Sequence, residues 1–183
     1  MLNDTELLTQ IEHVSDVFTR VMLKTIAADL SDSVEEISMA QFHALRHVAQ
    51  HGACTIGSLA EGLCVSQPAA TMLVDRMTRR GLVERRSSST DRRQAEVSLT
   101  ERAKDLLAQI ESERSERLGK ILGLMGGSER EQFVESLERF ISAALKLENA
   151  VDEACLRCGI EHYTDCIVNQ THLELAGRGV ERT

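Results

Sequence analysis

The stretch STDRRQAEVSLT, residues 89–100, is the strongest indication of the fold in this sequence. Charged residues come first, and apolar residues then alternate with polar ones: Asp91, Arg92 and Arg93, followed by Ala95, Val97 and Leu99. Such alternation is typical of a half-buried strand. Residues 82–86 can form a partner strand, which makes the polar loop 87–94 the tip of a hairpin. A basic tip of this kind suits a wing that lies against a phosphate backbone.

Three short helices are predicted before the hairpin. Ser38 and Gln41 have the spacing of a capping box, which opens a helix that stops at Gly52. A second helix covers about residues 55–62, and a tight turn follows it. Ser66 is a good N-cap for the third helix, in which Pro68 occupies the first turn and Gly81 lies just past the end. Two helices joined by a tight turn and followed by a hairpin predict a winged helix-turn-helix.

Charge is distributed unevenly along the chain. The 183 residues carry a net charge of -8, which disfavours indiscriminate binding to nucleic acid. Residues 75–93 nevertheless contain seven arginines and three acidic residues, a local charge of +4. No apolar run reaches the length of a membrane span, and residues 1–6 lack the basic and apolar regions that are typical of a signal peptide. We therefore expect a cytoplasmic protein without membrane contact, whose five cysteines are thiols or metal ligands rather than disulfides.

The third helix and the wing supply the candidate DNA contacts. Gln67 can bond adenine through two hydrogen bonds, Thr71 can contact a thymine methyl, and Arg76 can bond guanine or a phosphate. The wing arginines suit the minor groove or the backbone. The predicted DNA-binding residues are Ser66, Gln67, Ala70, Thr71, Arg76, Ser89, Arg92 and Arg93.

Long amphipathic helices flank the predicted winged helix-turn-helix. Apolar residues recur at helical spacing over residues 7–26, and two further helices are opened by Thr100 and by a second capping box at Ser128–Glu131. So many apolar stripes have few partners inside one small winged domain, which predicts a homodimer. The expected organisation is a domain at 1–150, with a DNA-binding core at about 38–100 and dimerisation helices at about 5–30 and 100–150, followed by an extension at 151–183. The fold class is mainly α with a small β-hairpin.

These features resemble the MarR family of bacterial transcription regulators. The resemblance lies in Ser66–Thr71, Val74–Met77 and Arg80–Arg85, and above all in Asp91-Arg92-Arg93 with the strand after it. It covers about residues 7–147 in element order. The resemblance implies an obligate homodimer that binds a pseudo-palindromic operator on double-stranded DNA. It also implies a small-molecule effector that binds between the dimerisation and DNA-binding regions and alters affinity.

The C-terminal extension is rich in potential metal ligands. Cys155, Cys158, His162 and Cys166 form a compact C-x2-C-x3-H-x3-C set, and His172 is an alternative fourth ligand. Four nitrogen and sulfur ligands suit tetrahedral zinc. An iron–sulfur cluster, redox-active thiols and incidental cysteines are the other interpretations. Cys54 and Cys64 stand at apolar positions and are expected to be small buried hydrophobes.

The sequence therefore predicts a dimeric DNA-binding regulator, a repressor, that answers to a ligand, a metal or a redox signal. The alternative is a metal- or redox-buffering protein whose winged domain serves protein contacts. An enzyme is not expected, because we find neither a Gly-rich phosphate loop nor a catalytic triad pattern.

Overall fold

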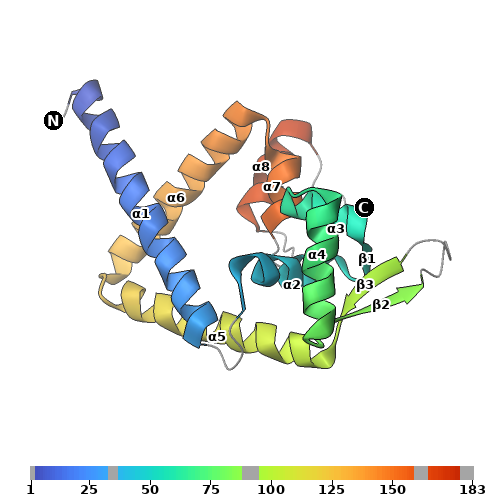
Figure 1. Ribbon diagram of the computed structural model, residues 1–183. Coiled ribbons are helices and arrows are strands. Elements are labelled where there is room, and N and C mark those ends of the chain that lie inside the picture. The colour runs from blue at the N-terminus through green and yellow to red at the C-terminus, as the bar shows by residue number, and fades with distance from the viewer. Residues whose placement is uncertain (1–2, 33–36, 88–94, 159–164, 178–183) are drawn as a thin grey trace.

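The computed structural model describes residues 3–32, 37–87, 95–158 and 165–177 of the chain. These residues form eight helices and three short strands (Figure 1). The helices are α1 (Asp4–Asp32), α2 (Met39–His51), α3 (Ile56–Leu63), α4 (Gln67–Arg79), α5 (Glu101–Gly123), α6 (Gly127–Glu148), α7 (Val151–Cys158) and α8 (Ile167–Ala176). The strands are β1 (Cys54–Thr55), β2 (Val83–Ser87) and β3 (Ala95–Leu99). The predicted fold class, mainly helical with a small antiparallel sheet, is confirmed.

Helices α2 to α4 and the sheet form one unit, which we call the head (residues 37–100). The sheet has the order β1-β3-β2 and is antiparallel throughout, with Cys54 opposite Val97 and Arg85 opposite the same residue on the other side. Strand β1 was not predicted, because two residues are too few to show a periodic pattern. The side chains at the centre of the head are almost fully buried: Phe42, Leu45, Leu59, Val74, Met77, Leu82 and Val97.

Side-chain caps begin the helices of the head where the sequence predicts them. The Ser38 hydroxyl accepts from the Gln41 amide at 3.3 Å, and the Ser38 amide donates to the Gln41 side chain at 2.9 Å. Ser66 and Thr100 also cap α4 and α5. The capping box predicted at Ser128 is wrong. Helix α6 begins two residues earlier, where the Gly126 amide donates to the Glu129 carboxylate at 2.6 Å, so Glu129 rather than Glu131 closes the first turn.

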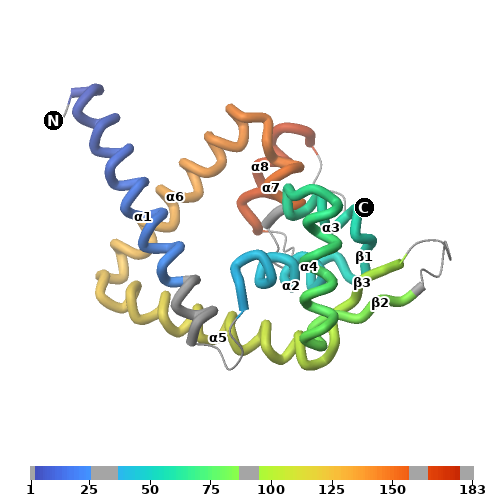
Figure 2. The backbone as a smooth tube through the Cα atoms, in the orientation of Figure 1, coloured from blue at the N-terminus to red at the C-terminus, as the bar shows by residue number. Residues whose placement is uncertain are grey.

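Helices α1, α5 and α6 form a second unit, which we call the arm. Helix α5 continues from the sheet and packs against α2, and α1 packs against α5 (Figure 1). The rings of Phe18 and Phe133 meet edge to face at 6.3 Å, which joins α1 to α6. The tube in Figure 2 shows α1 extending away from the rest of the chain toward its N-terminal end.

The remaining helices, α7 and α8, form the extension. They pack against each other and against α6, and α7 also contacts α3 of the head (Figure 1). Val151 and Thr171 are buried at these contacts. Among the described residues, no helix combines the length and the apolarity that a bilayer crossing requires.

Candidate nucleic-acid interface

Helix α4 is held firmly on one face and open on the other. Ala70, Val74 and Met77 are buried in the head and anchor the helix. The Ser66 hydroxyl accepts the Ala69 amide at 3.4 Å at the start, and Gly81, with φ 69°, redirects the chain just past the end. That positive φ favours glycine, so the sequence predicts this stop directly. A helix fixed in this way can present a constant surface to a partner.

The open face of α4 holds three of the eight residues predicted to contact DNA. Gln67 and Arg76 are exposed. Thr71 is half-buried, and its hydroxyl donates to the Gln67 carbonyl at 2.9 Å. A DNA base can therefore contact the Thr71 methyl group or donate a hydrogen bond to the Thr71 oxygen. It cannot accept a hydrogen bond from the Thr71 hydroxyl, whose proton is already used. Ala70 needs a correction, because its side chain is fully buried and belongs to the core of the head.

Two features of this surface were not predicted from the sequence. Met72 is 56 % exposed on α4 and adds an apolar contact beside the polar ones. Its position off the Ala70–Val74–Met77 stripe is the signal that could have identified it. The Arg85 guanidinium on β2 pairs with the Asp75 carboxylate on α4 at 2.5 Å. This ion pair ties the wing strand to the helix, and only the fold brings the two residues together.

The wing is described at its base and not at its tip. Strands β2 and β3 pair over all five residues, from Val83 opposite Leu99 to Ser87 opposite Ala95. Arg86 is exposed and pairs with Glu84 of the same strand at 2.5 Å. The predicted contacts Ser89, Arg92 and Arg93 lie outside the described residues. Their assignment to DNA stays a prediction.

The two cysteines of the head differ in environment. Cys54 is buried, and burial, with a smaller contribution from the Glu96 charge, raises the pKa of its thiol to about 11. The predicted role as a small buried hydrophobe fits this residue. The same prediction is wrong for Cys64, which is exposed at the end of α3 with a left-handed φ of 53°. The turn between α3 and α4 needs that conformation and turns Cys64 outward.

The predicted metal ligands of the extension are only partly described. Cys155 lies on α7 and Cys166 is the N-cap residue of α8, and both are half-buried thiols outside any disulfide. His172 Nε2 lies 3.5 Å from Asp152. The side chain of Cys158 and all of His162 lie outside the description. Within the described part of the extension and the rest of the chain, no three metal-binding side chains stand together.

Known proteins are similar to this chain in its DNA-binding unit. Residues 37–95, which span the capping box, α4 and strand β2, match the model of the MarR family. Over these residues the chain is similar to the MarR family. It is 29 % identical over 154 residues to YfiV of Bacillus subtilis, an uncharacterised HTH-type transcriptional regulator, covering 84 % of this chain and 94 % of that one. Regulators of transcription make up this family, which places the chain among regulators rather than enzymes.

Solved structures share the fold of this chain. A MarR family protein from Bacillus stearothermophilus superposes with a TM-score of 0.69 at 22 % identity, covering 79 % of this chain and 99 % of its own. FabT of Streptococcus pneumoniae, solved in complex with DNA, superposes with a TM-score of 0.63 at 20 % identity, covering 77 % of this chain and 99 % of its own. Both relatives are nearly completely covered, while about a fifth of this chain lies beyond them.

Proposed function

We propose that this protein is a homodimeric repressor of the MarR family that binds a pseudo-palindromic operator in double-stranded DNA. The observation that carries the proposal is the fixed helix α4, whose open face presents Gln67, Thr71 and Arg76 beside the wing. A helix in the major groove reads base edges, and basic wing residues contact phosphates or the minor groove. Bound across a promoter, such a dimer represses by excluding the polymerase.

Dimerisation is supported by the apolar surface of the arm. Eight large apolar side chains of α1 are exposed in the single chain: Leu7, Leu8, Ile11, Val14, Val17, Phe18, Val21 and Leu23. Helix α6 adds Phe133, Val134, Phe140 and Leu147, and none of its residues is buried. A soluble monomer rarely exposes so continuous an apolar surface. A second copy of the arm is the occupant of this face that a palindromic operator also requires.

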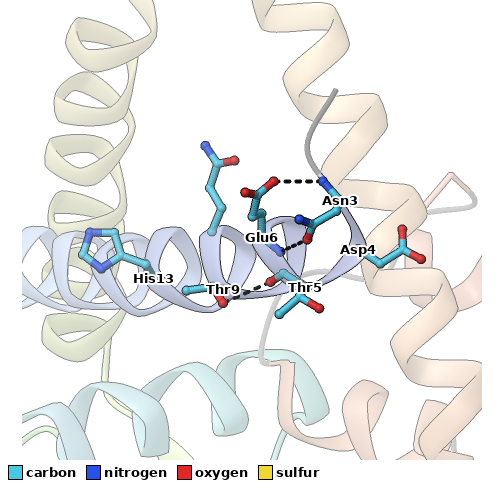
Figure 3. Close-up of a pocket in the computed structure, with 7 residues that line it drawn as sticks. Asn3, Asp4, Thr5, Glu6, Thr9 and His13 are labelled. Carbon is cyan, nitrogen blue, oxygen red and sulfur yellow. Dashed lines mark hydrogen bonds between the residues drawn. The ribbon is translucent and has the colours of Figure 1, made fainter.

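The hollow at the start of α1 does not offer an effector site. It measures about 750 Å³, but only the first turns of that single helix line it, as Figure 3 shows. The polar groups there are engaged with each other, since the Asn3 side chain accepts the Glu6 amide at 2.9 Å and the Glu6 carboxylate accepts the Asn3 amide at 3.0 Å. These bonds are a helix cap rather than a ligand site.

A better site for an effector lies at the foot of the wing. A hollow of about 510 Å³ is lined by the end of α2, by β2 and β3, and by the start of α5. Ser98 supplies a buried hydroxyl without a partner among the described residues, and the ion pairs Arg86–Glu84 and Lys104–Glu101 supply charges of both signs. A small polar ligand bound there would contact the wing and the arm at once. Binding of this kind would favour one position of the wing over another.

We also propose that the extension binds a metal ion through Cys155, Cys158 and Cys166, with His162 or His172 as the fourth ligand. The chemistry of the donor set supports zinc, and three thiolates also suit an iron–sulfur cluster. Elemental analysis of protein purified without oxygen should find about one zinc per chain, and Cys155→Ser should lose it. An iron content with a brown colour would select the cluster, and metal-free folded protein would exclude both.

The operator is the most direct test of the main proposal. Duplexes with a random centre are selected on wild-type protein, and the affinity of the recovered sequence is measured by fluorescence anisotropy at several salt concentrations. Arg76→Ala should lower affinity about tenfold and relax the preference at one position in each half-site. Arg92→Ala and Arg93→Ala should each reduce the salt slope by about one. The matched control is Arg139→Ala, an exposed arginine on α6 that is paired with Glu135. Recovery of no preferred sequence would refute operator binding.

A further inference from the structure

The extension contacts both of the other units of the molecule. On the side of the arm, the Lys146 ammonium of α6 pairs with the Glu174 carboxylate of α8 at 2.5 Å. Thr171 of α8 is fully buried, and its hydroxyl donates to the Ile167 carbonyl at 2.7 Å. Since that oxygen has a single proton, it accepts from the Ser142 hydroxyl of α6 at 3.0 Å. An ion pair and a buried hydrogen bond therefore help to anchor the extension on α6.

On the side of the head, α7 contacts α3 and also His47 of α2. The His47 side chain is only 3 % exposed and hydrogen-bonds to the backbone of Leu156 in α7. Nε2 of the ring is buried without a partner among the described residues, so Nδ1 is the donor to the Leu156 carbonyl. Burial, with help from the neighbouring His51, lowers the pKa of His47 to about 4. The ring is therefore neutral at physiological pH, with Nδ1 protonated by virtue of this one bond.

Helix α3 leaves room for this arrangement at Gly62. A Cβ atom at that position would lie 2.1 Å from Cε1 of the His47 ring. Any larger residue would push the ring out of its place between α3 and α7. The path from the head to the extension thus runs through three close neighbours: Gly62, His47 and Leu156.

We propose that the extension is a brace that sets the position of the head relative to the arm, with the His47–Leu156 hydrogen bond as one of its contacts with the head. The inference rests on the proposed binding of an operator. Without the brace, the head is held to the arm through α5 and the packing of α1 and α2. Two half-sites separated by a helical turn require two heads at a set spacing, so a second connection prepares the dimer for its operator. Cys155 directly precedes Leu156, which places a predicted metal ligand next to this contact.

The test removes the contact from the head side and measures two quantities. His47→Phe keeps a ring against Gly62 but has no donor, whereas His47→Asn keeps a donor near the place of Nδ1. His43→Phe is the matched control, an exposed histidine one turn earlier on the same helix. Hydrogen–deuterium exchange of residues 151–158 reports docking of α7. Anisotropy with the duplex selected by wild-type protein reports affinity.

We expect His47→Phe to speed exchange in α7 and to weaken DNA binding about fivefold, the size of one net hydrogen bond. His47→Asn should restore most of the exchange protection of α7 and most of the DNA affinity, and His43→Phe should change neither quantity. Unchanged exchange in folded His47→Phe protein would overturn the docking, and faster exchange with unchanged or tighter DNA binding would overturn the coupling. If wild-type protein selects no DNA, the proposed function fails and the coupling with it, while the exchange data still decide docking.

A second pair of variants keeps the test open if His47→Phe does not fold. Lys146→Glu and Glu174→Lys change exposed residues at the other end of the brace, and combining them restores opposite charges. Each single change should loosen α8 and weaken DNA binding about twofold, and the double change should recover both. Equal DNA affinity in all four proteins, despite loosened α8 in the single variants, would overturn the coupling.

Discussion

The head and the arm bury their apolar residues in different ways. In the head, side chains such as Phe42, Leu45 and Val74 have no exposed surface within the single chain. In the arm, Phe140 is 60 % exposed and Val14 is 56 % exposed, although both belong to clear apolar stripes. The head therefore completes its core within one chain, and the arm leaves a surface that a second copy can cover. An amphipathic pattern predicts which face is apolar but not what covers it.

Removal of one aromatic side chain from each unit should affect the head and the arm very differently. Phe42→Ala leaves a cavity in the closed core of the head and should lower the free energy of unfolding by about 3–5 kcal/mol. Phe140→Ala is the matched variant in the arm and should cost much less in a chain held as a monomer. Denaturant unfolding of both variants at low protein concentration gives the values. Equal losses would mean that the two units are packed alike.

A charge on the apolar face of α1 tests what covers the arm. Val14→Glu places two carboxylates in the proposed dimer interface, so the dissociation constant of the dimer should rise by about a hundredfold, or about 3 kcal/mol. Sedimentation velocity over a range of concentrations measures it, and Gln10→Glu serves as the control because it adds the same charge at a polar position of α1. A monomeric wild-type chain would contradict the proposed dimer.

Acid should weaken the head before it affects the arm. His47 has a pKa of about 4 in the folded chain against 6.5 when unfolded, so the unfolded state binds more protons between these values. The stability that this residue contributes is present above pH 6.5 and is lost as the pH falls toward 4. The free energy of unfolding should drop by about 2 kcal/mol from pH 7 to pH 4.5 through His47 alone. The free energy of unfolding, measured from pH 7 to pH 4.5, should depend more steeply on pH in wild type than in His47→Phe. Equal pH dependence in the two proteins would argue against a buried neutral histidine.

The smallest expected effect concerns the ion pair between the wing and α4. Asp75 and Arg85 are partly exposed, so their coupling should contribute less than about 1 kcal/mol to stability. A double-mutant cycle with Asp75→Ala and Arg85→Ala measures it. The coupling energy in DNA binding should exceed the coupling energy in stability, because the pair orients the wing relative to α4. A zero coupling energy in DNA binding would show that the wing keeps its position without this pair.

Local signals made the head predictable. Ser38, Ser66 and Thr100 cap helices because a side-chain oxygen can reach an amide three residues away, and Gly81 ends one because it tolerates a positive φ. The same logic failed at Ser128, where Gly126 and Glu129 form the first turn instead. Both stretches can close a turn of this kind, and sequence alone ranks a serine above a glycine as a cap.

The candidate site was predictable residue by residue but not as an arrangement. Gln67, Thr71 and Arg76 follow from their place off the buried stripe of α4. Ala70 was wrongly included, and Met72 and the Asp75–Arg85 pair were missed. Such errors arise where the outcome depends on which neighbour packs against a face, and that neighbour is distant in sequence.

The order of the helices and the hairpin strands β2 and β3 could be predicted from the sequence, because these elements depend on residues within one or two turns of each other. Only the tertiary structure decided that β1 joins the sheet, that Cys64 faces outward and that α7 docks on His47. Residues more than a hundred positions apart, such as His47 and Leu156, meet in this way. The free energy of these contacts comes from burial and hydrogen bonds that exist only once the chain has folded.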